Sequence, residues 1–161
     1  MSTLTKPPTV SVTLLIRRPP TQVFKALADP SQTSQLWWDS ASPNTPLAAN
    51  MTIQWTWSFY NVSTKVYVLA VEQDRLLRYK WESYDCENPT TVEWTFTPYE
   101  EDGEECTYVK VTEEGFTGDG DRQTLLAAQS TGGYTFVLCA VKAYVEFGVK
   151  LQVVKDAFRE V

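Results

Sequence analysis

The sequence predicts an α+β fold, in which a curved antiparallel sheet of six or seven strands carries two short helices and packs against a long C-terminal helix. Apolar and polar residues alternate over much of the first two thirds of the chain, and the spacing becomes helical near residue 122. At 161 residues, with no repeat or linker, the chain has the size of one domain. We therefore expect a single domain over residues 1–161.

The first elements are a strand and two short helices. Residues 9–16 alternate in the period-two pattern of a half-buried strand. Residues 21–28 place apolar side chains at helical spacing, and this helix should end at Asp29-Pro30 because the residue before a proline avoids the α region. A second short helix, over residues 31–36, leads into a pair of tryptophans.

The middle of the chain predicts a meander of antiparallel strands. Residues 51–59 alternate throughout, with apolar side chains on one face and mainly Thr, Gln and Ser on the other, which is typical of an amphipathic strand. Polar turns separate this segment from further strands over residues 65–72, 76–81, 92–96 and 107–113. Together with the first strand, these segments account for the predicted sheet.

From about residue 122 to Phe147 the apolar spacing is helical. A helix that follows a meander must lie across the sheet to bury its apolar residues. Gly132-Gly133 lies inside this helix, although helix interiors disfavour glycine by about 1 kcal/mol per residue. We therefore expect a kink, a joint between two helical pieces, or close contact with the sheet at this pair.

The charge of the chain excludes several classes of partner. The net charge is -6 and the pI is near 4.7, and the basic residues are scattered. Binding to nucleic acid or to an anionic membrane surface needs a local basic patch. The sequence contains no run of about 18 apolar residues, the length that a membrane-spanning helix needs. We expect neither nucleic-acid binding nor membrane insertion.

The residue types also restrict the chemistry. The chain has no histidine, which is the commonest metal ligand and the usual general base at neutral pH, so we expect no metal and no cofactor. Three cysteines without CxxC spacing, Cys86, Cys106 and Cys139, support neither a zinc site nor a disulfide framework. The first residues lack the apolar stretch of a signal peptide. These observations favour a reducing, cytoplasmic location.

The order of elements resembles the START/Bet v 1-like (SRPBCC) superfamily, whose fold is called helix-grip. Within it, the chain resembles the branch named for the C-terminal domain of the activator of Hsp90 ATPase. The segments that carry the resemblance are Pro19–Leu27, Trp37-Trp38, Arg75–Trp81, Val111–Phe116 and Gly133–Gly148. The chain departs from the branch at Phe147, where the family pattern often has a histidine after the glutamate near the end of the helix.

The resemblance implies a cavity between sheet and helix that holds a small apolar molecule. Relatives bind lipids, sterols, polyketides or hormones, and some are cyclases or hydrolases. Many members of this branch have no assigned biochemical role. Family membership therefore predicts architecture better than function.

Aromatic residues on one face of the strands, and the helix residues opposite them, are the candidate ligand-binding residues. Small residues on the helix facing large rings favour a cavity, although the same rings could form a filled core. The candidates are Trp37, Trp55, Trp57, Phe59, Tyr79, Trp81, Trp94, Phe96, Glu113, Phe136, Cys139, Ala140, Ala143 and Phe147.

Three acidic positions have alternative interpretations. Glu113 shares the parity of the apolar residues of its strand, so it could point inward and orient a polar ligand group or act as acid or base, or it could be a solvated strand end. Glu146 could lie at the cavity mouth or form a surface ion pair. The Asp119–Asp121 segment fits a helix cap better than a calcium loop, because it lacks the other ligands of such a loop.

Three functions from different classes remain open. The leading one is non-enzymatic binding of a small hydrophobic molecule by a carrier or sensor. The second is a co-chaperone-like module that binds a chaperone partner. The third is an enzyme, a cyclase or hydrolase, that uses Glu113, Tyr79 or Tyr134. A homodimer is compatible with all three.

Overall fold

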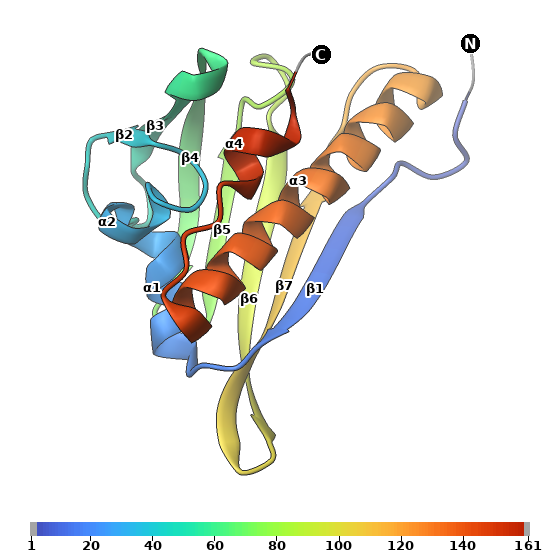
Figure 1. The fold of residues 1–161 in the computed structure, drawn as a ribbon. Helices are drawn as coiled ribbons and strands as arrows, with labels where there is room; N and C mark the ends of the chain where they lie inside the picture. Colours follow the sequence, from blue (N-terminus) through green and yellow to red (C-terminus); the bar gives the residue numbers. More distant parts are fainter. Residues whose placement is uncertain (1–2, 160–161) are drawn as a thin grey trace.

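The computed structural model describes residues 3–159 of the chain (Figure 1). The elements are β1 (Val10–Ile16), α1 (Pro20–Ala28), α2 (Pro30–Thr33), β2 (Ser40–Ser42), β3 (Thr52–Trp57), the 3-10 helix η1 (Ser58–Tyr60), β4 (Val62–Glu72), β5 (Leu76–Trp81), β6 (Thr90–Glu101), β7 (Glu104–Glu114), α3 (Gly120–Phe147) and α4 (Val153–Ala157).

The sheet is antiparallel throughout, with the strand order β1-β7-β6-β5-β4-β3-β2. The N-terminal strand pairs with β7, so that Val12 lies opposite Val111. Figure 1 shows α3 lying across one face of the sheet, with α4 beside it and α1 near its C-terminal end. The predicted α+β, helix-grip architecture is confirmed, with seven strands in the described part of the chain.

Proline and aspartate determine where the two short helices begin and end. Pro20 occupies the first position of α1, where its missing N–H leaves no helical hydrogen bond unmade. Asp29 then caps α2 by accepting a hydrogen bond from the backbone N–H of Ser31. Helix α2 ends at Thr33, earlier than predicted, and the Trp37 N–H donates to the Thr33 carbonyl oxygen. The turn that follows α2 places Trp37 between the sheet and α3.

Helix α3 is continuous, so the predicted kink or joint at Gly132-Gly133 is wrong. Close contact with the sheet is also wrong, because a Cβ atom added at either glycine would have no heavy atom within 4 Å apart from its immediate surroundings in the helix. The prediction of a cap is confirmed: the Asp119 side chain accepts a hydrogen bond from the Arg122 N–H. Gly148, at φ 68°, ends the helix.

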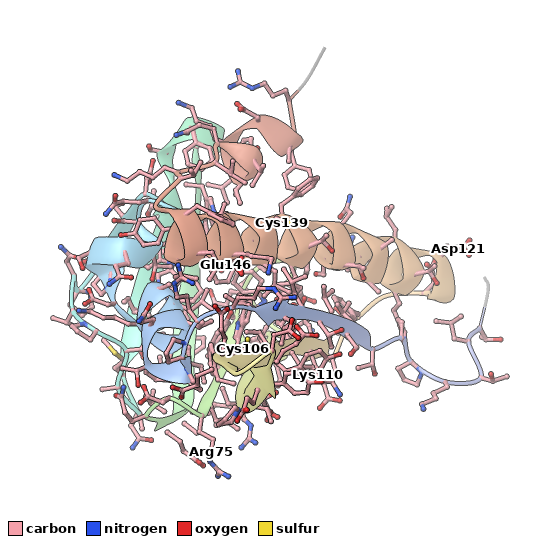
Figure 2. The ribbon with its side chains drawn as sticks, turned by 60° about the horizontal axis from the view of Figure 1, so that its bottom comes forward. Arg75, Cys106, Lys110, Asp121, Cys139 and Glu146 are labelled. Carbon is pink, nitrogen blue, oxygen red and sulfur yellow. The ribbon has the colours of Figure 1, made fainter. Side chains whose placement is uncertain are left out.

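The prediction that Phe136, Cys139 and Phe147 face the sheet is wrong. All three are exposed, and Figure 2 shows Cys139 on the side of α3 away from the sheet. The buried face instead carries Leu126, Tyr134, Val137, Leu138, Ala140 and Val141, while Ala143 is half-buried.

The misassignment has a physical cause, because α3 has apolar residues on two faces and no charged residue between Arg122 and Lys142. Spacing alone cannot then distinguish the buried face from the exposed one. For the same reason, α3 is long and apolar enough to span a membrane by length and composition, a property that core helices share.

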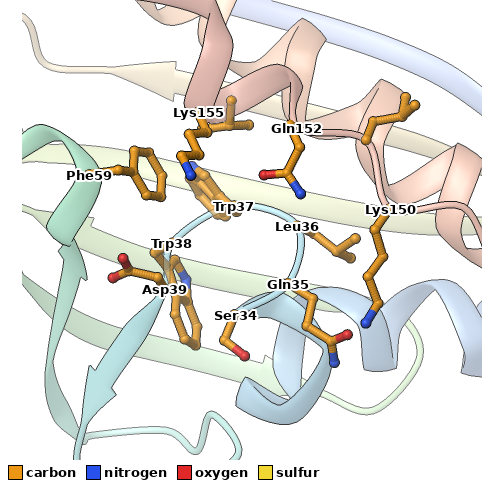
Figure 3. Close-up of a pocket in the computed structure, with 12 residues that line it drawn as sticks. Ser34, Gln35, Leu36, Trp37, Trp38, Asp39, Phe59, Lys150, Gln152 and Lys155 are labelled. Atoms are coloured by element: carbon orange, nitrogen blue, oxygen red, sulfur yellow. The ribbon is translucent and has the colours of Figure 1, made fainter.

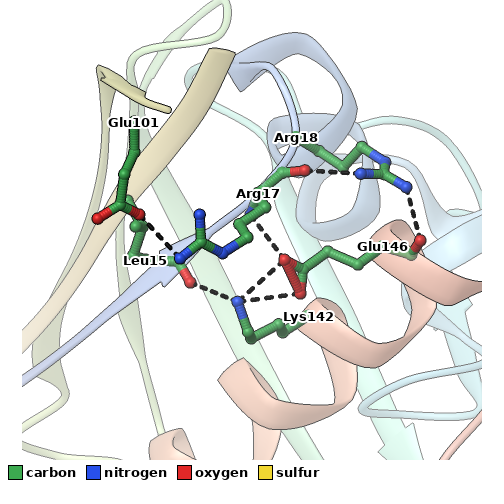
Figure 4. A network of polar contacts seen from close by, with 6 residues as sticks. All are labelled: Leu15, Arg17, Arg18, Glu101, Lys142 and Glu146. Atoms are coloured by element: carbon green, nitrogen blue, oxygen red, sulfur yellow. Dashed lines mark hydrogen bonds and ion pairs between the residues drawn. The ribbon is translucent and has the colours of Figure 1, made fainter. Parts of the chain in front are cut away.

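A polar network ties the end of α3 to β1 (Figure 4). The Glu146 carboxylate, which is buried, accepts a hydrogen bond from the Arg17 backbone N–H at 2.9 Å. Lys142 Nζ lies 2.9 Å from Glu146 Oε2 and donates to the Leu15 carbonyl oxygen at 2.8 Å. Arg18 donates to the Glu146 carbonyl oxygen. Glu146 is therefore a buried structural ion-pair partner.

Candidate functional site

Trp37 is the centre of an aromatic cluster between the sheet and α3. Its ring centroid lies 5.2 Å from that of Trp55 and 6.4 Å from that of Tyr134. Its other ring neighbours within this distance range are Trp57, Trp81 and Trp94. Most pairs are edge-on or tilted, which is the arrangement that aromatic quadrupoles favour. The cluster fills much of the space that the sequence predicts to be a cavity.

Five of the predicted aromatic residues on the strands are buried core residues and line neither of the two pockets described below. Four of them are at most 1% exposed, and the fifth, Trp57, is slightly more exposed. For this part of the sheet the filled-core interpretation holds. The five are Trp55, Trp57, Tyr79, Trp94 and Phe96.

A pocket of about 260 Å³, here called the ring pocket, lies at the edge of this cluster beside α3. Two of the predicted residues, Trp37 and Trp81, line it. Among the other lining residues, the sequence singles out only Tyr134, as a possible acid or base, and Gly133, within the glycine pair of the long helix. The complete lining is Trp37, Trp81, Tyr84, Gln129, Ser130, Gly133, Tyr134 and Phe158.

Gly133 leaves part of the ring pocket open, because it has no side chain and a Cβ atom there would have no neighbour within 4 Å. Trp81 and Tyr134 form a stacked pair of rings in the wall, with an interplanar angle of 28°. Tyr84 reaches over from the loop between β5 and β6, and its hydroxyl is 2.7 Å from Ser130 Oγ. The pocket is thus mainly aromatic with a small polar rim.

The last wall of the ring pocket comes from the C-terminal segment. The Tyr60 hydroxyl donates to the carbonyl oxygens of Val154 and Lys155 and accepts a hydrogen bond from the Phe158 N–H. The Phe158 ring contacts the rings of Tyr60 and Phe136. Tyr60 therefore holds the segment that brings Phe158 to the pocket.

A second pocket, of about 310 Å³, lies on another side of Trp37 (Figure 3). The predicted residue Phe59 lines it, together with Trp38 and residues from the C-terminal segment such as Lys150 and Lys155. Its lining is more polar than that of the ring pocket, with charged side chains at its border. It is less suited to an apolar ligand.

Glu113 is completely buried directly behind the ring pocket. The indole N–H of Trp81 donates to Glu113 Oε1 at 2.8 Å, and the Thr90 hydroxyl donates to the same oxygen at 2.5 Å. Glu113 Oε2 and the Tyr134 hydroxyl have no hydrogen-bond partner among residues 3–159. Glu113 therefore points inward, as its parity in the strand predicts, and the interpretation as a solvated strand end is wrong.

The buried tyrosine hydroxyls near Glu113 stay protonated at neutral pH. Burial raises the pKa of Tyr134 well above its ordinary value of 10, and the negative charge of Glu113 raises it further. Burial likewise raises the pKa of Tyr79, whose oxygen accepts a hydrogen bond from the Trp94 indole N–H at 3.1 Å. These hydroxyls serve as hydrogen-bond donors and acceptors at this pH.

Comparison with known proteins places the chain in context. Residues 17–145 match the sequence model of the family described as Activator of Hsp90 ATPase homolog 1-like protein. No protein matches in a comparison with the curated proteins.

Solved structures show the same fold. A protein from Staphylococcus saprophyticus is 22% identical, with a TM-score of 0.72 over 90% of this chain and 96% of that protein. DynU16, from the dynemicin biosynthetic locus, is 21% identical, with a TM-score of 0.71 over 88% of this chain, which spans only 48% of DynU16. The dimeric Aha1 of Colwellia psychrerythraea is 15% identical, with a TM-score of 0.72 over 88% of this chain and 98% of that one.

Proposed function

The chain belongs to the Activator of Hsp90 ATPase homolog 1-like family, and from this premise we propose that its ring pocket binds one small, mostly apolar molecule without transforming it. The observation that carries the proposal is the space beside Gly133, about 260 Å³, facing the rings of Trp37, Trp81 and Tyr134. An aromatic pocket with a few polar groups is typical of small-molecule sites.

The size of the pocket limits the ligand. Small-molecule pockets usually measure about 300–1,000 Å³, so the ring pocket is at the lower limit. Because the Trp37 cluster fills the neighbouring interior, a long-chain lipid or a sterol has no room without rearrangement of the core. The proposal is therefore a compact ligand of one or two rings.

Burial of the ligand's apolar surface supplies the driving force, at about 25 cal/mol per Å² removed from water. The Tyr84 and Ser130 hydroxyls and the Gln129 amide at the rim offer hydrogen bonds that can orient it. Glu113 does not line the pocket, because Trp81 and Tyr134 lie between, so acid–base catalysis by direct contact is not favoured.

Replacing Gly133 with leucine should fill the ring pocket and lower the affinity for 2-naphthylmethanol by about tenfold or more. Leucine also favours the helix over glycine, so α3 should remain folded. Isothermal titration calorimetry measures the affinity, and circular dichroism verifies the fold.

Gly132→Leu provides the matched control, since Gly132 is the neighbouring glycine of α3 and does not line the ring pocket. It should bind the probe as the wild type does. Equal loss in both variants, or no loss in Gly133→Leu, would show that the probe binds elsewhere and that the proposed pocket is wrong.

A second candidate, interaction with a chaperone, is favoured by the exposed apolar face of α3. Leu125 and Phe147 are 58% and 77% exposed. If this face binds an Hsp90-type ATPase, the protein should change the ATPase rate of purified Hsp90. Phe147→Glu should then remove the effect, whereas Glu104→Gln, on the hairpin between β6 and β7, should not. An ATPase rate that the wild-type protein leaves unchanged would eliminate this candidate.

A further inference from the structure

We infer that the ring pocket selects a ligand that carries a hydrogen-bond-donating group, a hydroxyl or an ammonium, and rejects an anionic one, through Glu113 and Tyr134. This inference rests on the proposed binding function and adds the chemical class of the ligand. It begins from two buried polar atoms without partners, Glu113 Oε2 and the Tyr134 hydroxyl oxygen.

Hydrogen-bond donors and acceptors are unequal in number around Glu113. Three donors are present, namely the Trp81 indole N–H and the hydroxyls of Thr90 and Tyr134. A carboxylate alone can accept about four hydrogen bonds, and the two hydroxyl oxygens can accept more. However the Tyr134 hydroxyl is turned, an acceptor remains without a donor.

Tyr134 connects this excess to the ring pocket. Tyr134 lines the pocket, and its hydroxyl oxygen is buried. If the hydroxyl donates to Glu113 Oε2, its oxygen is left to accept a hydrogen bond from a ligand group that reaches it. A ligand hydroxyl or ammonium can complete this arrangement. A ligand carboxylate brings no donor and leaves the shortage unchanged.

The charges around the pocket favour the same selection. No Lys or Arg side chain among residues 3–159 forms an ion pair or hydrogen bond with Glu113, so this buried carboxyl group has no cationic partner. Charges interact more strongly in the low-dielectric interior than in water. The faces of the Trp and Tyr rings are also negative and attract cations.

The test compares three probes that share a naphthalene ring: 2-naphthylmethylammonium, 2-naphthylmethanol and 2-naphthoate. We expect the ammonium and the alcohol to bind the full-length protein at least about tenfold more tightly than 2-naphthoate. In Glu113→Gln the amide supplies a donor and removes the charge, so the ammonium and 2-naphthoate should bind with affinities within about threefold of each other.

Glu114→Gln is the matched control, because it removes the same charge from the next residue of β7, which is exposed. It should keep the wild-type preference. If Glu113→Gln does not fold, Tyr134→Phe keeps the carboxylate and removes the hydroxyl, and it should weaken binding of the alcohol by about tenfold. An unchanged affinity in that variant would overturn the inference.

The outcomes separate this inference from the proposed function. The wild type could bind all three probes with equal affinity, and Gly133→Leu could lose that binding. This result would overturn the proposed ligand class but would support the ring pocket as the binding site. The same holds if Glu113→Gln folds and keeps the wild-type preference. Failure of every probe to bind the wild type would overturn both proposals.

Discussion

Replacing Trp37 with alanine is expected to lower the free energy of unfolding by about 3–5 kcal/mol, the range for removal of a large buried aromatic side chain. Trp37 is only 7% exposed and contacts five other rings. Those rings belong to three strands, β3, β5 and β6, and to α3, so they cannot readily move together to close the cavity. Urea denaturation followed by circular dichroism measures the change.

Tyr99→Ala is the control for this substitution, because Tyr99 lies on β6 and is 52% exposed. Tyr99→Ala should change the free energy of unfolding by no more than about the 0.5 kcal/mol typical of surface substitutions. Trp37 lines both the ring pocket and the pocket of Figure 3, so its removal should also join the two. A loss below about 1 kcal/mol would mean that the cluster does not support the core as described.

Replacing Lys142 with methionine is expected to lower the free energy of unfolding by about 2–3 kcal/mol. Removing one partner of a buried ion pair costs about 3–5 kcal/mol, and the Lys142 side chain is 31% exposed, so water compensates part of the loss. The Glu146 carboxylate would keep only the hydrogen bond from the Arg17 N–H, and the Leu15 carbonyl oxygen would lose the hydrogen bond from Lys142. Chemical denaturation at neutral pH measures the effect.

Two further variants identify the cause. Arg75→Met breaks an exposed ion pair with Glu72 and should cost less than about 1 kcal/mol. The double variant Lys142→Met/Glu146→Leu removes both charges of the pair and should recover more than half of the stability that Lys142→Met loses. If the double variant is no more stable than Lys142→Met, an unpaired charge is not the reason for the loss.

The sheet was predictable because period-two alternation and half-buried strands have one physical origin. The alternation also predicts the inward orientation of Glu113 correctly, since β7 pairs with β6 residue by residue without a bulge. The structure places its register shift in β4, between Val68 and Ala70, where parity would have been less informative.

The buried face of α3 was not predictable in the same way. Phe136, Cys139 and Phe147 form a helical stripe as regular as the one that is buried. Only the packed sheet shows which stripe lies inside. With no charged residue between Arg122 and Lys142, the sequence offers no polar face to exclude.

The ring pocket could not be predicted because its walls come together only in the folded chain. Phe158 reaches it through the hydrogen bonds of Tyr60, and Tyr84 through a loop with no regular spacing. Whether rings fill or line a space depends on fractions of a side-chain volume, which composition does not contain. Gly133 was the sequence feature that pointed to the pocket, and the missing side chain leaves space beside α3.

β1 joins the sheet beside β7, and Val12 therefore pairs with Val111. During translation, the first strand leaves the ribosome long before its partner has been made. The partners of the Arg17 N–H and the Leu15 carbonyl oxygen are synthesised later still, because they are Glu146 and Lys142 of α3. Contacts between such distant residues slow folding, and the apolar strands made first stay uncovered and prone to aggregation until synthesis is nearly complete.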